Sequence, residues 1–141
     1  MSREGFDNIG ALHHVEINVS DLKRSCEFWG WFLGELGYEP FQRWDEGASW
    51  KLGATYIVFV QTIDRYKDHG YHRRATGLNH IAFHARSKEH VDAITAELNR
   101  RGCAVLYRDQ HPHAGGEDHY AVFFEDPDRI KVELVAPSHD S

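Results

Sequence analysis

The chain has 141 residues, of which 41% are hydrophobic and 27% are charged, values ordinary for a protein with its own hydrophobic core. Its formal net charge of −6 argues against nucleic acid as the main partner, because binding to phosphates needs a basic face. We find no apolar run of membrane-spanning length and no signal-peptide pattern, so we expect a cytoplasmic protein without membrane partners.

The first predicted element is a strand over residues 9–19, where polar and apolar residues partly alternate. One face of this strand is apolar, and the other carries His14, Glu16 and Asn18. Such a polar face points either into a cavity or into water, and the pattern alone does not choose between them.

A helix is predicted next, beginning at the capping residues Ser20 and Asp21 and reaching about Leu36. Cys26 lies on its apolar stripe; we expect it and the distant Cys103 to be reduced core residues rather than a disulfide. Three short strands follow, over residues 38–44, 48–52 and 55–61.

Residues 63–77 are polar and predict a linker, after which the same order of elements returns. The second series is a strand over 78–85, a helix over 87–101, a strand over 104–108, a loop over 109–118, and strands over 120–125 and 130–135. The chain therefore repeats a βαβββ order, which indicates two related modules that bury faces against each other or against a partner.

The repeat places two histidines at the same point of the two first strands, because His14 and His80 are 66 residues apart within matching segments. Glu133 lies between Val132 and Leu134 in the last strand, where a buried carboxylate needs a partner. Two imidazoles and one carboxylate suggest a metal site. The alternative is that the histidines are hydrogen-bonded core or surface residues.

Three segments carry a resemblance to a known family: HVEINVSD at 14–21, NHIAF at 79–83 and FEDPDRIKVEL at 124–134. In these segments the chain resembles the vicinal oxygen chelate superfamily, which includes glyoxalases, bleomycin-binding proteins and extradiol dioxygenases. The resemblance implies an α+β fold in which two βαβββ modules form a curled mixed sheet around a cleft. It implies a single glyoxalase-like domain over residues 1–141, with modules at about 9–62 and 78–137 joined by the linker at about 63–77.

The resemblance also implies metal ligands on the first and last strands of the modules. Carried over residue by residue, these are His14, His80 and Glu133, and the fourth position falls on Val58, which cannot bind a metal. The four-ligand pattern of glyoxalases and epimerases is thus incomplete. Two histidines and one carboxylate remain, as in the extradiol dioxygenases and the fosfomycin-resistance enzymes. Gln61 lies three residues beyond Val58 and so on the opposite strand face.

A divalent ion held by three protein ligands keeps coordination positions open for a substrate with two adjacent oxygens. Such ligands accept Zn, Ni, Mn or Fe. We therefore expect a metal-dependent lyase, isomerase or dioxygenase that acts on a small oxygen-rich substrate by bidentate chelation and Lewis-acid catalysis. The alternative is a non-catalytic small-molecule-binding protein of the bleomycin-resistance kind.

Three further residues are candidates for catalysis. Glu16 shares a strand face with His14 and is either a general base, an acceptor behind a ligand, or solvent-facing. His113 and Tyr120 lie in or beside a histidine-rich loop, which is either a lid that transfers protons or a solvated surface loop. Because the chain has one module pair, we expect two copies to complete the cleft as a homodimer.

Overall fold

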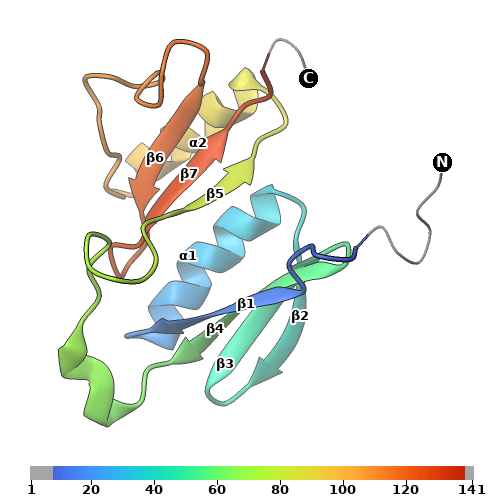
Figure 1. Ribbon diagram of the computed structural model, residues 1–141, viewed down its shortest axis with the longest axis vertical. Helices are drawn as coiled ribbons and strands as arrows, with labels where there is room; N and C mark the ends of the chain where they lie inside the picture. The colour runs from blue at the N-terminus through green and yellow to red at the C-terminus, as the bar shows by residue number, and fades with distance from the viewer. Residues whose placement is uncertain (1–7, 139–141) are drawn as a thin grey trace. The chain divides into compact units, whose positions relative to one another are not determined.

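The computed structural model of the protein describes residues 8–138, and the chain divides between His69 and Gly70 into two compact units (Figure 1). The predicted fold class is confirmed, because each unit combines one α-helix with a mixed β-sheet. The strands of the described residues lie in two sheets, one in each unit, rather than in a single sheet.

The first unit holds a four-stranded sheet in the order β1-β4-β3-β2. β1 is parallel to β4, and the other pairs are antiparallel. Helix α1 packs on β3 and β4, as Figure 1 shows. The elements of this unit are β1 (His14–Val19), α1 (Leu22–Glu35), β2 (Glu39–Trp44), β3 (Gly47–Leu52), β4 (Thr55–Gln61) and the short 3₁₀ helix η1 (Asp64–His69).

Aromatic rings fill the core between α1 and this sheet. Trp29 is fully buried and stacks on Phe59 of β4 with ring centroids 5.0 Å apart, and Trp50 meets the same ring from β3 at 5.8 Å. Gly30 lets the helix approach the sheet, since a Cβ at this position would lie 3.1 Å from the Trp50 ring. Large buried rings supply much of the hydrophobic stabilisation of a small core.

Gln61, the last residue of β4, ties the end of this strand to the start of α1. Its side-chain oxygen accepts a hydrogen bond from the Leu22 N–H at 2.9 Å, and its amide nitrogen donates to the Ser20 carbonyl at 2.8 Å. Asp21 caps α1 by accepting from the Arg24 N–H. Gln61 therefore fixes the start of the helix.

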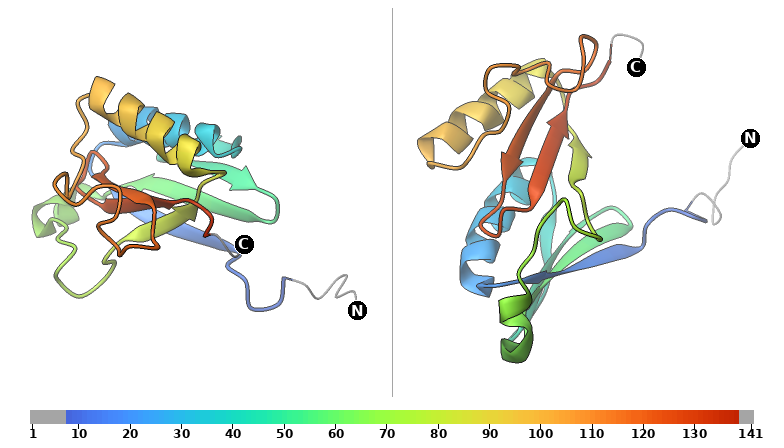
Figure 2. Two further views of the ribbon diagram at one scale, coloured as in Figure 1. Left: turned by 90° about the horizontal axis from the view of Figure 1, so that it is seen from above. Right: turned by 60° about the vertical axis from the view of Figure 1, so that its left-hand side comes forward.

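The second unit holds a three-stranded sheet in the order β5-β7-β6, with β5 parallel and β6 antiparallel to β7. Figure 2 shows helix α2 along one face of this sheet, and the buried stripe of α2 is Val91, Ile94 and Leu98. The elements are β5 (Ile81–His84), α2 (Lys88–Arg100), β6 (Ala121–Glu125) and β7 (Lys131–Val135).

The strand predicted over residues 104–108 is wrong. Within the described residues, this segment makes only an isolated bridge between Val105 and Phe124. Tyr107 has a φ of 54°, a left-handed conformation that cannot continue an extended strand. The second sheet accordingly has one strand fewer than the first.

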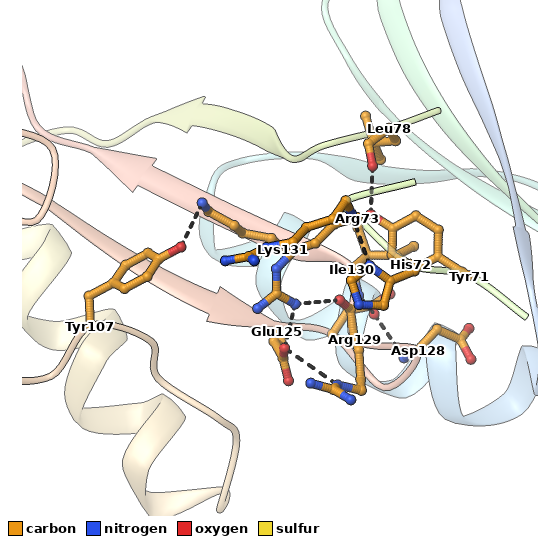
Figure 3. A network of polar contacts seen from close by, with 12 residues as sticks. Tyr71, His72, Arg73, Leu78, Tyr107, Glu125, Asp128, Arg129, Ile130 and Lys131 are labelled. Atoms are coloured by element: carbon orange, nitrogen blue, oxygen red, sulfur yellow. Dashed lines mark hydrogen bonds and ion pairs between the residues drawn. The ribbon is translucent and has the colours of Figure 1, made fainter. Parts of the chain in front are cut away.

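The second part of the predicted linker is bound to the second unit (Figure 3). Arg73 donates to the Glu125 carboxylate at 2.6 Å and to the Arg129 carbonyl at 3.3 Å. Tyr71 donates to the Leu78 carbonyl at 2.8 Å. Within residues 8–138, the structure contains no helix with the length and apolar character that a membrane crossing requires.

Candidate functional site

The two faces of the second sheet differ in character. Val122, Phe124, Val132 and Leu134 are fully buried on the face that α2 covers. Because side chains alternate along strands, the next residues point the other way. This opposite face carries Glu133 of β7, whose register partner on β6 is Phe123.

Glu133 is the centre of a cluster of three side chains on this face, which we call the Glu133 cluster: His80, His119 and Glu133. The His80 Nε2 atom lies 3.2 Å from one carboxylate oxygen, and the His119 Nε2 atom contacts the other. The Glu133 side chain is 7% exposed, whereas the two histidine side chains are 34% and 38% exposed. Both oxygens of a buried carboxylate are thus engaged by imidazoles that reach solvent.

The His80 ring is held from its other side as well. Asn79 Oδ1 lies 2.7 Å from His80 Nδ1, so this nitrogen donates its proton to the amide oxygen. Phe123 packs edge-on against the same ring, with centroids 6.4 Å apart. An acceptor behind Nδ1 is the usual way in which proteins orient a metal-binding imidazole and direct Nε2 outward.

Among the described residues, no three His, Cys, Asp or Glu side chains stand around a common point at metal-binding spacing. The members of the Glu133 cluster instead contact one another directly. They are nevertheless of the right chemical type, since two imidazole nitrogens and a carboxylate are ordinary ligands of Zn, Ni, Mn and Fe.

The sequence pattern does not predict His119 as a ligand and places it only within a histidine-rich region. It precedes the start of β6 and joins the cluster because the loop before it returns to the sheet. Gly115 takes part in this approach, because a Cβ at that position would overlap the His119 ring. A glycine that accommodates a ring has no signature in the sequence, so spacing alone could not identify His119.

In the first unit, His14 is the exposed first residue of β1. Its ring stacks flat on Tyr56, with centroids 4.7 Å apart, and its Nδ1 lies 2.8 Å from Nδ1 of His13. Glu16 lies on the same face and is also exposed. His80 and Glu133 come together within the second unit, whereas the participation of His14 and Glu16 in one site with them stays a prediction.

The parallel strand pairs of the two modules establish which residues correspond. In the first module Glu16 pairs with Val58, and in the second Ala82 pairs with Glu133. Since Glu16 and Ala82 each lie two residues after the module's histidine, Val58 and Glu133 hold equivalent places. Val58 is 3% exposed.

His113 and Tyr120 lie together beside α2. The Tyr120 hydroxyl donates to the Asp92 carboxylate at 2.5 Å, and the His113 ring meets the Tyr120 ring edge-on at 5.6 Å. The hydrogen bond to Asp92, followed by burial, raises the pKa of Tyr120 to about 12. Burial lowers the pKa of the neighbouring His111. Near neutral pH Tyr120 therefore stays protonated. The polar and ring contacts of His113 and Tyr120 do not include Glu133.

Comparison with known proteins agrees with this fold. A family described as the glyoxalase/bleomycin resistance protein/dioxygenase superfamily matches residues 13–123. The uncharacterised protein YqjT of Bacillus subtilis (strain 168) is 59% identical over 127 residues, which cover 90% of this chain and 99% of that protein.

Solved structures show the same similarity. A crystal structure from Bacillus halodurans, provisionally described as a glyoxalase, is 61% identical and superposes with a TM-score of 0.91, covering 92% of this chain and 98% of that one. The lactoylglutathione lyase of Agrobacterium tumefaciens shares the fold at 18% identity and a TM-score of 0.62, with 90% of this chain and 93% of that one covered. The chain therefore belongs to the glyoxalase/bleomycin resistance protein/dioxygenase superfamily.

Proposed function

We propose that the protein is a divalent-metal-dependent enzyme that acts on a small oxygen-rich substrate by bidentate chelation and Lewis-acid catalysis. The observation that carries the proposal is the Glu133 cluster, in which two imidazole nitrogens converge on one buried carboxylate. A lyase with the same fold, the lactoylglutathione lyase of A. tumefaciens, supports enzymatic activity as the first candidate.

The donor atoms of the cluster fit a cation. His80 faces an acceptor at both nitrogens, Asn79 Oδ1 at Nδ1 and a Glu133 oxygen at Nε2. A neutral imidazole carries one proton and satisfies only one of these acceptors. A divalent ion between Nε2 and the carboxylate would satisfy the second, and burial of Glu133 would strengthen its attraction for the ion.

His80, His119 and Glu133 are the residues that would hold the ion, and His14 is the further ligand that the sequence predicts. When bound, a divalent ion supplies Lewis acidity toward the two chelating oxygens of a substrate. The protein residues hold the donors in place: Asn79 orients His80, and Gly115 allows His119 to reach the carboxylate. Zn, Ni, Mn and Fe all suit these donors.

Proton transfer is proposed for Glu16, His113 and Tyr120, as the sequence predicts. For Tyr120, a pKa of about 12 excludes a phenolate base near neutral pH, and its hydroxyl proton, which is donated to Asp92, would have to leave that contact to reach a substrate. We also propose that the protein is cytoplasmic and that it forms a homodimer. Light scattering of the purified protein would test the homodimer.

A second candidate function is non-catalytic binding of a small molecule, as in bleomycin resistance proteins. It is favoured by Val58, a buried apolar residue where the second module has Glu133. The apolar residue removes one ligand of the four-ligand pattern that the resemblance implies. In this alternative the Glu133 cluster stabilises the module and binds no metal.

Metal analysis of protein purified without a histidine tag separates the two candidates. The enzyme proposal predicts close to one Mn, Fe, Ni or Zn per chain after reconstitution, and a rise in melting temperature that chelator reverses. Glu133→Gln should abolish both effects, whereas the control variant Glu117→Gln, in the loop before His119, should keep them. Protein that neither retains metal nor melts at a higher temperature with any of the four ions would exclude the enzyme proposal.

A further inference from the structure

A lysine lies beside the Glu133 cluster without a carboxylate partner. Lys131 precedes Glu133 by two residues on β7, so both side chains point to the same face of the sheet, about 7 Å apart along the strand. The Lys131 ammonium donates a hydrogen bond to the Tyr107 hydroxyl at 2.9 Å (Figure 3). It also lies 5.0 Å from the centroid of the Tyr107 ring and 5.2 Å from that of Phe123.

Both carboxylates nearest to Lys131 in the sheet are engaged by other groups. Glu125 is its register partner on β6, but the Glu125 carboxylate pairs with Arg73 at 2.6 Å and with Arg129 at 3.6 Å. Glu133 is occupied by the two histidines of the cluster. Among residues 8–138, Lys131 consequently forms no ion pair, and its charge is met only by aromatic rings and a hydroxyl.

The hydrogen bond between Lys131 and Tyr107 leaves donors available for a ligand. The phenol oxygen accepts from the ammonium, so its own proton points elsewhere, and the ammonium keeps two further N–H groups. These donors are charged or polarised by a charge, and such donors form the strongest hydrogen bonds to anionic oxygens. Arg73 and Arg129 both pair with the Glu125 carboxylate, so this carboxylate does not compete with a ligand for the Lys131 ammonium.

Tyr107 reaches this position through an unusual backbone conformation. Its φ of 54° is uncommon for a bulky side chain, and it ends the extended backbone at the Val105 bridge. The turn carries the Tyr107 ring back over the sheet, against Phe123 at 5.4 Å and above Lys131. A backbone conformation of this kind in a non-glycine residue is a reason to look for function.

We propose that Lys131 and Tyr107 form a subsite for an anionic group of the substrate, next to the Glu133 cluster. As a statement of substrate class this rests on the proposed function: the substrate carries two adjacent oxygens at one end and a carboxylate or phosphonate at the other. The separation of about 7 Å along β7 sets the approximate spacing between the two ends. Lys131 neutralises the anionic group, and Tyr107 donates a hydrogen bond that fixes its orientation.

The test uses the full chain treated with chelator, so that its result does not depend on metal binding. Methylphosphonate and acetate are titrated separately, with neutral acetamide as a third probe, and amide NMR shifts are followed at Tyr107 and Lys131. We expect saturable shifts with at least one anion and none with acetamide. Tighter binding of methylphosphonate would assign the anionic group of the substrate as a phosphonate or phosphate. Tighter binding of acetate would assign it as a carboxylate.

Variants establish which residues bind the anion. Lys131→Met should weaken binding about tenfold or more, and Tyr107→Phe by a smaller factor. Lys131→Arg, which keeps the charge, should retain binding, and unchanged amide shifts of Lys131→Met away from residues 107 and 131 show that this variant is folded. Lys88→Met is the matched control, because Lys88 also lies over a tyrosine ring, that of Tyr120 at 5.4 Å.

Three results would overturn the proposal: no saturable shift of the wild-type protein with either anion, equal shifts with acetamide, or equal weakening by Lys88→Met and Lys131→Met. If the proposed enzyme function is wrong, metal analysis will find no bound metal, while anion binding at Lys131 and Tyr107 stays intact. The two failures are therefore distinguishable.

Discussion

Val58 and Glu133 occupy the same place in the last strands of the two modules, yet one is an apolar core residue and the other binds two histidines. Their equivalence follows from the strand registers, in which Val58 pairs with Glu16 and Glu133 pairs with Ala82. Of the two equivalent positions, only the one in the second module thus carries a polar group. Because both positions are almost fully buried, the exchange of residue type has a measurable cost.

Val58→Glu should therefore destabilise the protein. The new carboxylate would lie at a position that is 3% exposed, and an unpaired buried charge is expected to lower the free energy of unfolding by about 2–4 kcal/mol. The conservative variant Val58→Ile should stay within about 1.5 kcal/mol of the wild type. Denaturant titrations of both variants measure the difference. Equal stability of Val58→Glu and wild type would mean that module one already offers a partner for a carboxylate.

His119→Ala should reduce metal affinity more than about tenfold, because it removes one of the two imidazoles that contact Glu133. His113→Ala serves as the matched control, since His113 lies in the same loop region but contacts Tyr120. We expect its metal affinity to stay within about twofold of the wild type, as for substitutions outside the ligand set. Calorimetric titration with Zn, Ni or Mn gives both values. The assignment of His119 would be wrong if the two variants lost affinity equally.

Tyr120 should make stability fall at high pH. The Asp92 hydrogen bond raises the pKa of Tyr120 to about 12 in the folded chain, against about 10 in an unfolded one. Between these values the folded state holds a proton that the unfolded state has lost, so stability is complete below about pH 10 and declines as pH rises toward 12. Tyr120→Phe should lack this part of the decline. Melting curves from pH 9 to 12 test it, and identical slopes for wild type and variant would contradict the prediction.

Arg73→Met should destabilise the second unit by about 1–3 kcal/mol, because it leaves the Glu125 carboxylate, 11% exposed, without its 2.6 Å partner. The adjacent Arg74 is exposed and provides the control, so Arg74→Met should change stability by less than about 0.5 kcal/mol. Hydrogen exchange across residues 70–78 would show which segment opens. Equal protection in the two variants would exclude Arg73 as the anchor of this segment.

Much of the fold could be predicted from the sequence, because hydrophobic periodicity and capping residues act locally. The strand over 55–61 was predicted with the bounds of β4, and the helix ends near Leu36 and Arg101 differ by one residue from α1 and α2. The prediction of a strand over 104–108 is wrong because hydrophobic periodicity does not reveal backbone conformation. The left-handed backbone of Tyr107 ends the extended segment.

The candidate site was partly predictable in the same way. The repeat indicates His80, and the apolar residues on either side indicate Glu133; the two side chains contact each other. The sequence pattern could not identify His119, whose place depends on the path of the preceding loop and on the space left by Gly115. The residue type of Tyr120 suggests proton transfer, but its hydroxyl donates to Asp92. This contact between α2 and the residue before β6 is determined only by the fold.

Anomalous diffraction at the metal edge, from crystals reconstituted with Zn or Mn, would show whether the Glu133 cluster holds a divalent ion. We expect one anomalous peak per chain, about 2.0–2.2 Å from Nε2 of His80, Nε2 of His119 and an oxygen of Glu133. The same map would show whether His14 is a fourth ligand. An anomalous peak elsewhere, or none at full reconstitution, would contradict this expectation and leave small-molecule binding without metal as the function.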